Sequence, residues 1–114
     1  MTVQEFYEKV GGSYNDVFAR FGNENIIVHF LKMLLKDNTI IEFKTAVNEM
    51  NIDMAFRSAH TMKGTLSNLG LTALFNRDFE IVELLRRRDL DGALVLIPAF
   101  LDEYKKTTAE IELL

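Results

Sequence analysis

Apolar residues recur along this chain with the spacing of an α-helix, and this pattern restricts the possible folds more than any other feature. Near the end of the chain one face is spaced four, three, four and three residues apart, at Ile97, Leu101, Tyr104, Thr108 and Ile111. The Val/Ile/Thr alternation of β-strands is missing, and the sequence contains a single proline. The sequence therefore predicts an all-α fold.

Short polar or glycine-containing breaks divide this pattern into segments. Gly22 ends one segment, Gly70 ends another, and Asn23 and Asp53 are candidate N-caps for the segments that follow them. Pro98 lies within the last segment, so we expect a kink or a later start there. The predicted helices cover residues 2–10, 14–21, 24–36, 40–50, 54–69, 71–88 and 92–113.

Short breaks between amphipathic helices favour antiparallel neighbours. We therefore expect the last four long segments to form an antiparallel up-down four-helix bundle, with the additional N-terminal helices at its end or side. A chain of 114 residues, 48% of them hydrophobic, suits one domain over residues 1–114. Within it, residues 1–22 would be an N-terminal cap segment and residues 23–113 the helical bundle; the sequence does not predict what the cap segment does.

Several functional classes conflict with the composition. The net charge of -4 disfavours non-specific nucleic-acid binding, and the lack of cysteine excludes disulfides and thiolate sites. No apolar run approaches the ~20 residues of a transmembrane helix. The first ten residues lack the basic and then apolar pattern of a secretory signal. We expect a cytoplasmic monomer with no membrane or nucleic-acid partner.

The segment AHTMKGTLSNLG, residues 59–70, carries the most informative group of polar residues. In a helix over 54–69, the apolar side chains share an arc of about 80°, and His60 lies about 140° from its centre. The imidazole is therefore predicted to point away from the core. The apolar residues on that arc are Ala55, Ala59, Met62, Leu66 and Leu69.

The neighbours of His60 on the helical wheel indicate a reactive group. Lys63 and Gly64 lie one turn after it, and glycine inside a helix costs about 1 kcal/mol relative to alanine. An open space beside the imidazole would account for that cost. The residues predicted on the side of His60 are Phe56, Arg57, Lys63, Gly64 and Ser67, with Asn68 about 80° away.

These residue types suit phosphoryl transfer. A neutral imidazole nitrogen is a good nucleophile, and a transferring phosphoryl group spreads negative charge over its equatorial oxygens. Lys63 would supply positive charge, Gly64 would leave room for the phosphoryl group, and Ser67 would donate a hydrogen bond.

The segment resembles the signature of histidine-containing phosphotransfer (HPt) domains, H-x-x-K-G followed by small residues and N-x-G. The residues at the matching positions are His60, Lys63, Gly64, Asn68 and Gly70. Leu66 departs from the small polar residues that are common there, and the helical wheel assigns it to the core. The flanking sequence and the helix pattern over about 24–113 are also similar to the family.

The resemblance implies that His60 accepts a phosphoryl group from a receiver-domain aspartate and passes it to another. Lys63 would help hold that group, and Gly64 would give the partner access. The chain would be a phosphocarrier and not an autonomous enzyme, with no metal or cofactor, because the receiver supplies Mg²⁺ and the aspartate. The implied partners are response-regulator receiver domains, with a hybrid histidine kinase as a further candidate. Phe56, Arg57, Ser67 and Asn68 are the predicted docking residues.

Two other functions remain open at this point. The chain could be a non-catalytic docking module, with Phe56 as the anchor and His60 incidental. It could also be a histidine-dependent phosphohydrolase, although no nucleotide loop, metal cluster or second general acid accompanies His60. His29, the other histidine, is predicted on the polar side of its helix, too isolated for a metal site.

Two further features of the segment 71–88 carry predictions. Its set of apolar residues includes Phe79, and Asp78 falls near the same side, so Asp78 is predicted to pair with a cation or to lie at the edge. Arg86, Arg87 and Arg88 end the segment, where cations favour the helix dipole, and a docking role is the alternative.

Overall fold

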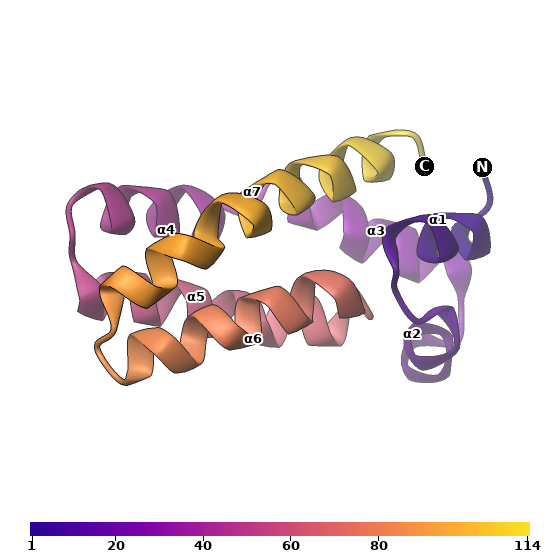
Figure 1. The fold of residues 1–114 in the computed structure, drawn as a ribbon. Coiled ribbons are helices and arrows are strands. Elements are labelled where there is room, and N and C mark those ends of the chain that lie inside the picture. The colour runs from indigo at the N-terminus through magenta and orange to yellow at the C-terminus, as the bar shows by residue number, and fades with distance from the viewer.

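A computed structural model describes residues 1–114 and contains seven α-helices and no strand (Figure 1). The prediction of an all-α fold is confirmed. The helices are α1 (Val3–Val10), α2 (Tyr14–Phe21), α3 (Glu24–Leu34), α4 (Thr39–Asn48), α5 (Ile52–Asn68), α6 (Thr72–Arg86) and α7 (Leu90–Glu112).

Side-chain caps begin most of these helices. Asn23 accepts a hydrogen bond from the Ile26 amide, as an N-cap residue should. The prediction that Asp53 caps α5 is wrong, because Asn51 accepts the bond from the Met54 amide at 3.1 Å and the helix begins at Ile52. Asp53 instead lies in the first turn of α5.

Of the two effects predicted for Pro98, a kink or a later start, the later start is wrong. α7 begins at Leu90, where Asp89 accepts a hydrogen bond from the Gly92 amide at 2.9 Å, and continues through the proline to Glu112. Pro98 is exposed, so water can replace the backbone hydrogen bond that its missing N–H removes.

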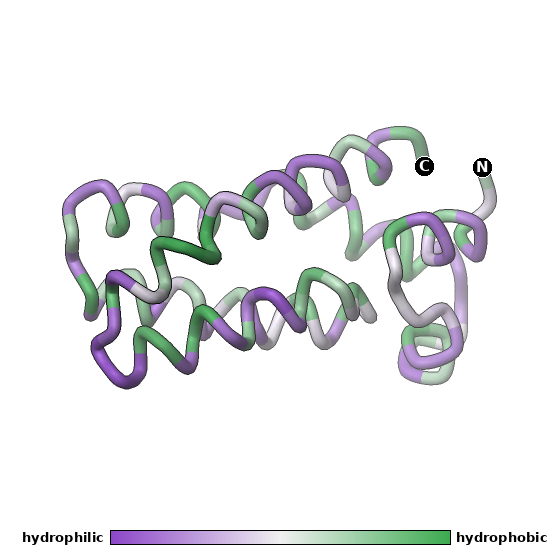
Figure 2. Tube along the Cα trace, viewed as in Figure 1, coloured by the Kyte–Doolittle hydropathy of each residue, from purple (hydrophilic) through white to green (hydrophobic).

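The core joins all seven helices into one body. α4, α5 and α6 each pack against the next helix along the chain, and α3 packs against α2 and α7 (Figure 1). Twenty-four buried hydrophobic residues form a single cluster. Apolar and polar residues alternate along these helices (Figure 2), which is the amphipathic pattern that such packing requires.

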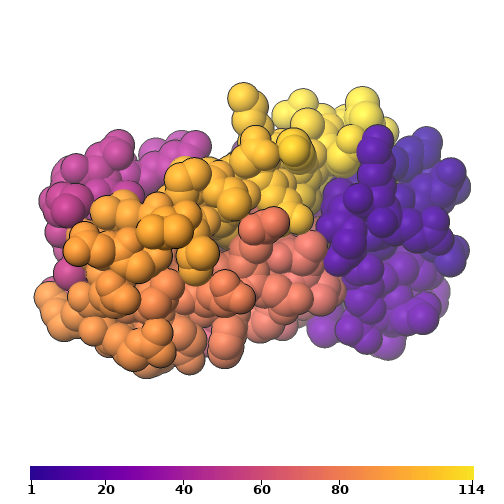
Figure 3. Space-filling view, in the orientation of Figure 1, coloured from indigo at the N-terminus to yellow at the C-terminus, as the bar shows by residue number.

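Residues 1–22 form one end of the elongated molecule, which measures 40 × 21 × 19 Å (Figure 3). They are attached to the turn between α5 and α6 by hydrogen bonds to backbone carbonyls. The Tyr7 hydroxyl donates to the Leu69 carbonyl at 2.7 Å, the Ser13 amide to the Gly70 carbonyl at 2.9 Å, and Arg20 to the Asn68 carbonyl at 2.6 Å. The N-terminal helices therefore hold the C-terminal end of α5, a role that the sequence did not predict.

Glycine is required where these two parts of the chain meet. Gly70 has a φ of +67°, and a Cβ placed there would lie 2.9 Å from the Ser13 carbonyl oxygen. A Cβ on Gly12 would lie 2.6 Å from the Gly70 carbonyl oxygen. Both glycines allow the backbone of the N-terminal segment to approach the α5–α6 turn.

Loss of the Tyr7 hydroxyl should weaken this attachment. We expect Tyr7→Phe to lower the free energy of unfolding by about 1–3 kcal/mol, because it leaves the Leu69 carbonyl without the donor that now satisfies it in the protein interior. Urea denaturation measures the change. Tyr14→Phe is the matched control, since its hydroxyl bonds Glu24 at the surface and its loss should matter much less. Equal losses in the two variants would contradict the assigned role.

Candidate functional site

The middle of α5 presents His60 to solvent. Ala55, Ala59, Met62 and Leu66 on the opposite side are buried in the core, and His60 is exposed, as the helical wheel predicts. Phe56, one turn before, is half-buried, and its ring centroid lies 5.7 Å from that of the imidazole. The imidazole therefore stands beside an aromatic ring on an otherwise accessible helix face.

Gly64 lies one turn after His60 and leaves the space around it open. A Cβ placed on Gly64 would meet no atom within 4 Å, apart from the helix backbone around it. Close packing of another element does not require the glycine, in contrast to Gly12 and Gly70. The bare backbone thus gives an incoming group access to the imidazole.

Lys63 lies on the same helix but leans toward α6. Its side chain is half-buried, and its ammonium lies 5.6 Å from the centroid of the Phe79 ring. On α6, burial raises the pKa of Asp78 and the hydrogen bond with Arg86 lowers the pKa of Glu83, and the positive charge of Lys63 acts downward on both. The ammonium is therefore placed against α6 in this conformation.

α6 adds residues to the site that sequence reasoning did not assign to it. Phe79 was predicted among the apolar set, yet it is 42% exposed and lies under the Lys63 ammonium. The Arg86 guanidinium lies 5.1 Å from the centroid of the Phe56 ring and bonds Glu83 at 2.8 Å. Aromatic rings and cations thus alternate between α5 and α6 beside His60.

Asp78 contradicts both expectations for it. It is completely buried, and neither of its carboxylate oxygens has a hydrogen-bond partner, so it is neither paired nor at an edge. Burial raises the pKa of Asp78 to about 8, and the charge of Lys63 opposes this shift. The polarity of these neighbouring positions is therefore inverted: Asp78 faces inward, and Phe79 faces outward.

The remaining docking residues predicted from the sequence are all exposed. Ser67 and Asn68 lie in the last turn of α5, and the Asn68 carbonyl is held by Arg20 of α2. Arg57 lies one turn before His60 and contacts the Met54 sulfur at 3.8 Å. All three lie on the same helix as His60 but make no hydrogen bond with it.

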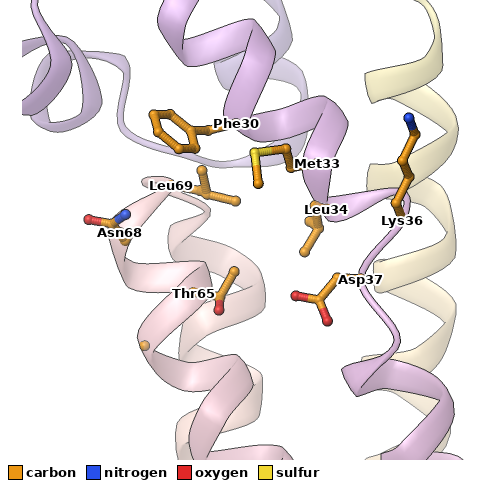
Figure 4. Close-up of a pocket in the computed structure, with 9 residues that line it drawn as sticks. Phe30, Met33, Leu34, Lys36, Asp37, Thr65, Asn68 and Leu69 are labelled. Atoms are coloured by element: carbon orange, nitrogen blue, oxygen red, sulfur yellow. The ribbon is translucent and has the colours of Figure 1, made fainter.

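A groove of about 730 Å³ opens on the other side of Gly64, between α3 and α5 (Figure 4). Phe30 and Met33 of α3 extend toward Leu69 and Asn68 at the end of α5. The open space at Gly64 is therefore continuous with a partly apolar surface. The residues that line this α3–α5 groove are Phe30, Met33, Leu34, Lys36, Asp37, Gly64, Thr65, Asn68 and Leu69.

No group of three or more His, Cys, Asp or Glu side chains is placed to hold a metal ion. His29 is exposed and contacts the Phe30 ring at a centroid distance of 5.6 Å. None of the helices combines the length and the apolar character that crossing a bilayer requires.

Comparison of the chain with protein-family models, curated proteins and solved structures finds no match. The functional assignment therefore depends on the residues around His60 and on their geometry.

Proposed function

We propose that this chain is a histidine phosphotransfer (HPt) protein, a phosphocarrier between receiver domains. The observation that carries the proposal is the exposed imidazole of His60 above the open backbone at Gly64, on a helix whose opposite side is buried. A surface histidine without a function would not need a glycine beside it in the middle of a helix.

In the proposed reaction, a ring nitrogen of His60 attacks the phosphorus of a receiver aspartyl phosphate. The new N–P bond forms as the bond from phosphorus to the aspartyl oxygen breaks, and the aspartate leaves as a carboxylate. A second receiver aspartate reverses the step. The partner supplies Mg²⁺ and the carboxylate, so this chain contributes the nucleophile, the space and the charge of Lys63. It carries out no turnover alone and holds no cofactor.

For the fold we propose the up-down four-helix bundle that is typical of this family. α4 to α7 would be its four helices, and α3 would extend the line of α4. The connections between α4 and α5, between α5 and α6, and between α6 and α7 are each three residues long, and such short connections favour antiparallel neighbours. The two helices on either side of each connection also pack against each other (Figure 1). We place the protein in the cytoplasm with its partners, as a monomer.

The proposed docking surface extends from α6 across His60 to the α3–α5 groove. On the α6 side, Phe56 and Phe79 offer apolar contact, and Arg86 offers positive charge. On the groove side, Met33 is 51% exposed. An interface with a partly apolar centre and cations at its rim suits a transient complex with an acidic receiver surface.

The second candidate is a docking module without chemistry. The observation in its favour is the set of exposed rings at Phe56 and Phe79, which would bind a partner whether or not His60 reacts. The experiment below separates these two functions.

Incubation with a panel of phosphorylated receiver domains from the same organism tests the proposal. We expect label on the wild-type chain that is acid-labile and base-stable, and a decrease of at least about 100-fold for His60→Gln, because the nucleophile is lost. His29→Gln is the matched control, since it removes the only other histidine, which is also exposed, and should keep the label.

If His60→Gln accepted label as well as wild type, the carrier role would be rejected. Binding of a receiver by wild type and by His60→Gln with equal affinity, and without transfer to either, would favour the docking module.

A further inference from the structure

The buried carboxyl group of Asp78 needs a physical explanation. It is 0% exposed, and both oxygens lack a hydrogen-bond partner. Buried polar groups in folded proteins are normally hydrogen-bonded, and an unpartnered carboxyl group destabilises the folded state. A group that costs stability and lies beside a functional residue is a candidate for a role in function.

The charged group that acts on Asp78 is Lys63. The ammonium of Lys63 lies over the Phe79 ring, and its charge reaches both Asp78 and Glu83. No direct ion pair joins Lys63 to either carboxylate. Lys63 is therefore held on α6 by a ring face and by nearby negative charge, without a contact that would fix it.

Two other carboxylates near this point already have partners. Glu83 on α6 bonds Arg86, and Glu103 on α7 pairs with Arg77, the residue before Asp78. On α5, Lys63 is the charged residue that acts on Asp78. When Asp78 ionises, its negative charge therefore attracts Lys63 more strongly than any other cation.

We propose that Asp78 is a positioning residue for Lys63, and that its charge decides whether the ammonium stays on α6 or turns to the phosphoryl group on His60. This inference rests on the proposed function. Lysine has a long, flexible side chain, and His60 lies one turn before it on the same helix. A neutral Asp78 leaves the ammonium free to turn, and an ionised Asp78 holds it on α6 and slows the transfer.

Side-chain NMR of Lys63 in the unphosphorylated protein tests this coupling without any phosphoryl transfer. Between pH 6 and pH 9, the Lys63 side-chain resonances of wild type should show an inflection that coincides with the titration of the Asp78 carboxyl carbon. Asp78→Asn should remove the inflection. Lys106, which pairs with Asp102 on α7, is the internal control and should be unaffected. Identical Lys63 curves in wild type and Asp78→Asn would overturn the proposal.

Transfer rates give the second measurement. The ratio of the wild-type rate to the Asp78→Asn rate should fall about fivefold between pH 6.5 and pH 9, the effect of about 1 kcal/mol of added attraction on Lys63. A ratio cancels the pH dependence of the receiver and of His60 itself. In the Lys63→Ala background, the ratio of the rate with Asp78 to the rate with Asp78→Asn should not change between pH 6.5 and pH 9. A fivefold fall that persisted without Lys63 would contradict the positioning role.

Asp78→Leu is a second variant, which keeps the test valid if Asp78→Asn folds poorly. It removes the charge and fills the site with an apolar side chain of similar size, and it should abolish the Lys63 inflection as Asp78→Asn does. If receivers never phosphorylate His60, the proposed function fails while the NMR result still decides the coupling. If transfer occurs but Lys63 ignores Asp78, the coupling alone fails.

Discussion

Relative to wild type, the Asp78→Asn variant is expected to gain about 5 kcal/mol of stability between pH 4 and pH 8. Burial raises the pKa of this carboxyl group from 3.8 to about 8 in the folded protein, and each pKa unit corresponds to about 1.36 kcal/mol. Asp78 is completely buried, so solvent does not screen much of this cost. The total stability of a domain is about 5–15 kcal/mol, which makes this residue a large liability at neutral pH.

The sign of the effect follows from proton binding. Below pH 4 the carboxyl group is protonated in both the folded and the unfolded chain, so its ionisation does not change the free energy of unfolding. Between pH 4 and pH 8 the unfolded chain has released this proton and the folded protein still holds it, so stability falls by about 1.4 kcal/mol per pH unit. Above pH 8 both states are ionised and the loss stops growing. Asparagine cannot ionise, so its variant lacks this slope.

Urea denaturation from pH 4 to pH 9 provides the measurement, and the difference between the two stability curves is the quantity to compare. This difference removes the contribution of carboxylates such as Glu83, whose pKa is lowered by its hydrogen bond with Arg86. Asp91→Asn, which changes an exposed carboxylate in the first turn of α7, is the control and should follow the wild-type curve. Parallel curves for wild type and Asp78→Asn would show that Asp78 is ionised at neutral pH.

Local chemistry explains what the sequence could predict. Helix ends follow from residues that act within one turn, such as Asn23 as a cap and Gly22 in the left-handed conformation at a φ of +67°. The exposure of His60 follows from helical periodicity alone, because one face of α5 is occupied by small and apolar side chains. Both kinds of information are contained in fewer than about twenty consecutive residues.

Long-range contacts explain what the sequence could not predict. Tyr7 bonds the Leu69 carbonyl across 62 residues of chain, and no local pattern records a partner that is a backbone oxygen. The α3–α5 groove likewise needs the relative position of two helices. Asp78 and Phe79 are inverted because packing against α5 and α7 fixes the rotation of α6, and the polarity of two residues is too weak a signal to reveal it.

Substitutions of Gly64 are expected to lower phosphoryl transfer without lowering the stability of the fold. Gly64→Ala should raise the free energy of unfolding by up to about 1 kcal/mol, because alanine is the better helix former and its Cβ would meet no atom within 4 Å. Gly64→Gln should also keep the fold, since the side chain would extend into solvent and the groove. It should lower transfer to His60 at least about 100-fold, because it fills the space that the phosphoryl group and the receiver need, and small misplacements of reacting groups cost that much.

Thr61→Gln is the control that makes this result specific. It places the same side chain on the exposed part of α5, next to His60 in sequence but about 100° away around the helix, and it should retain near wild-type transfer. Unfolding curves and transfer rates measured on the three variants give both quantities. If Gly64→Gln transferred as fast as Thr61→Gln, the open backbone would not serve the reaction, and the glycine would have no explanation in this fold, since nothing packs against it.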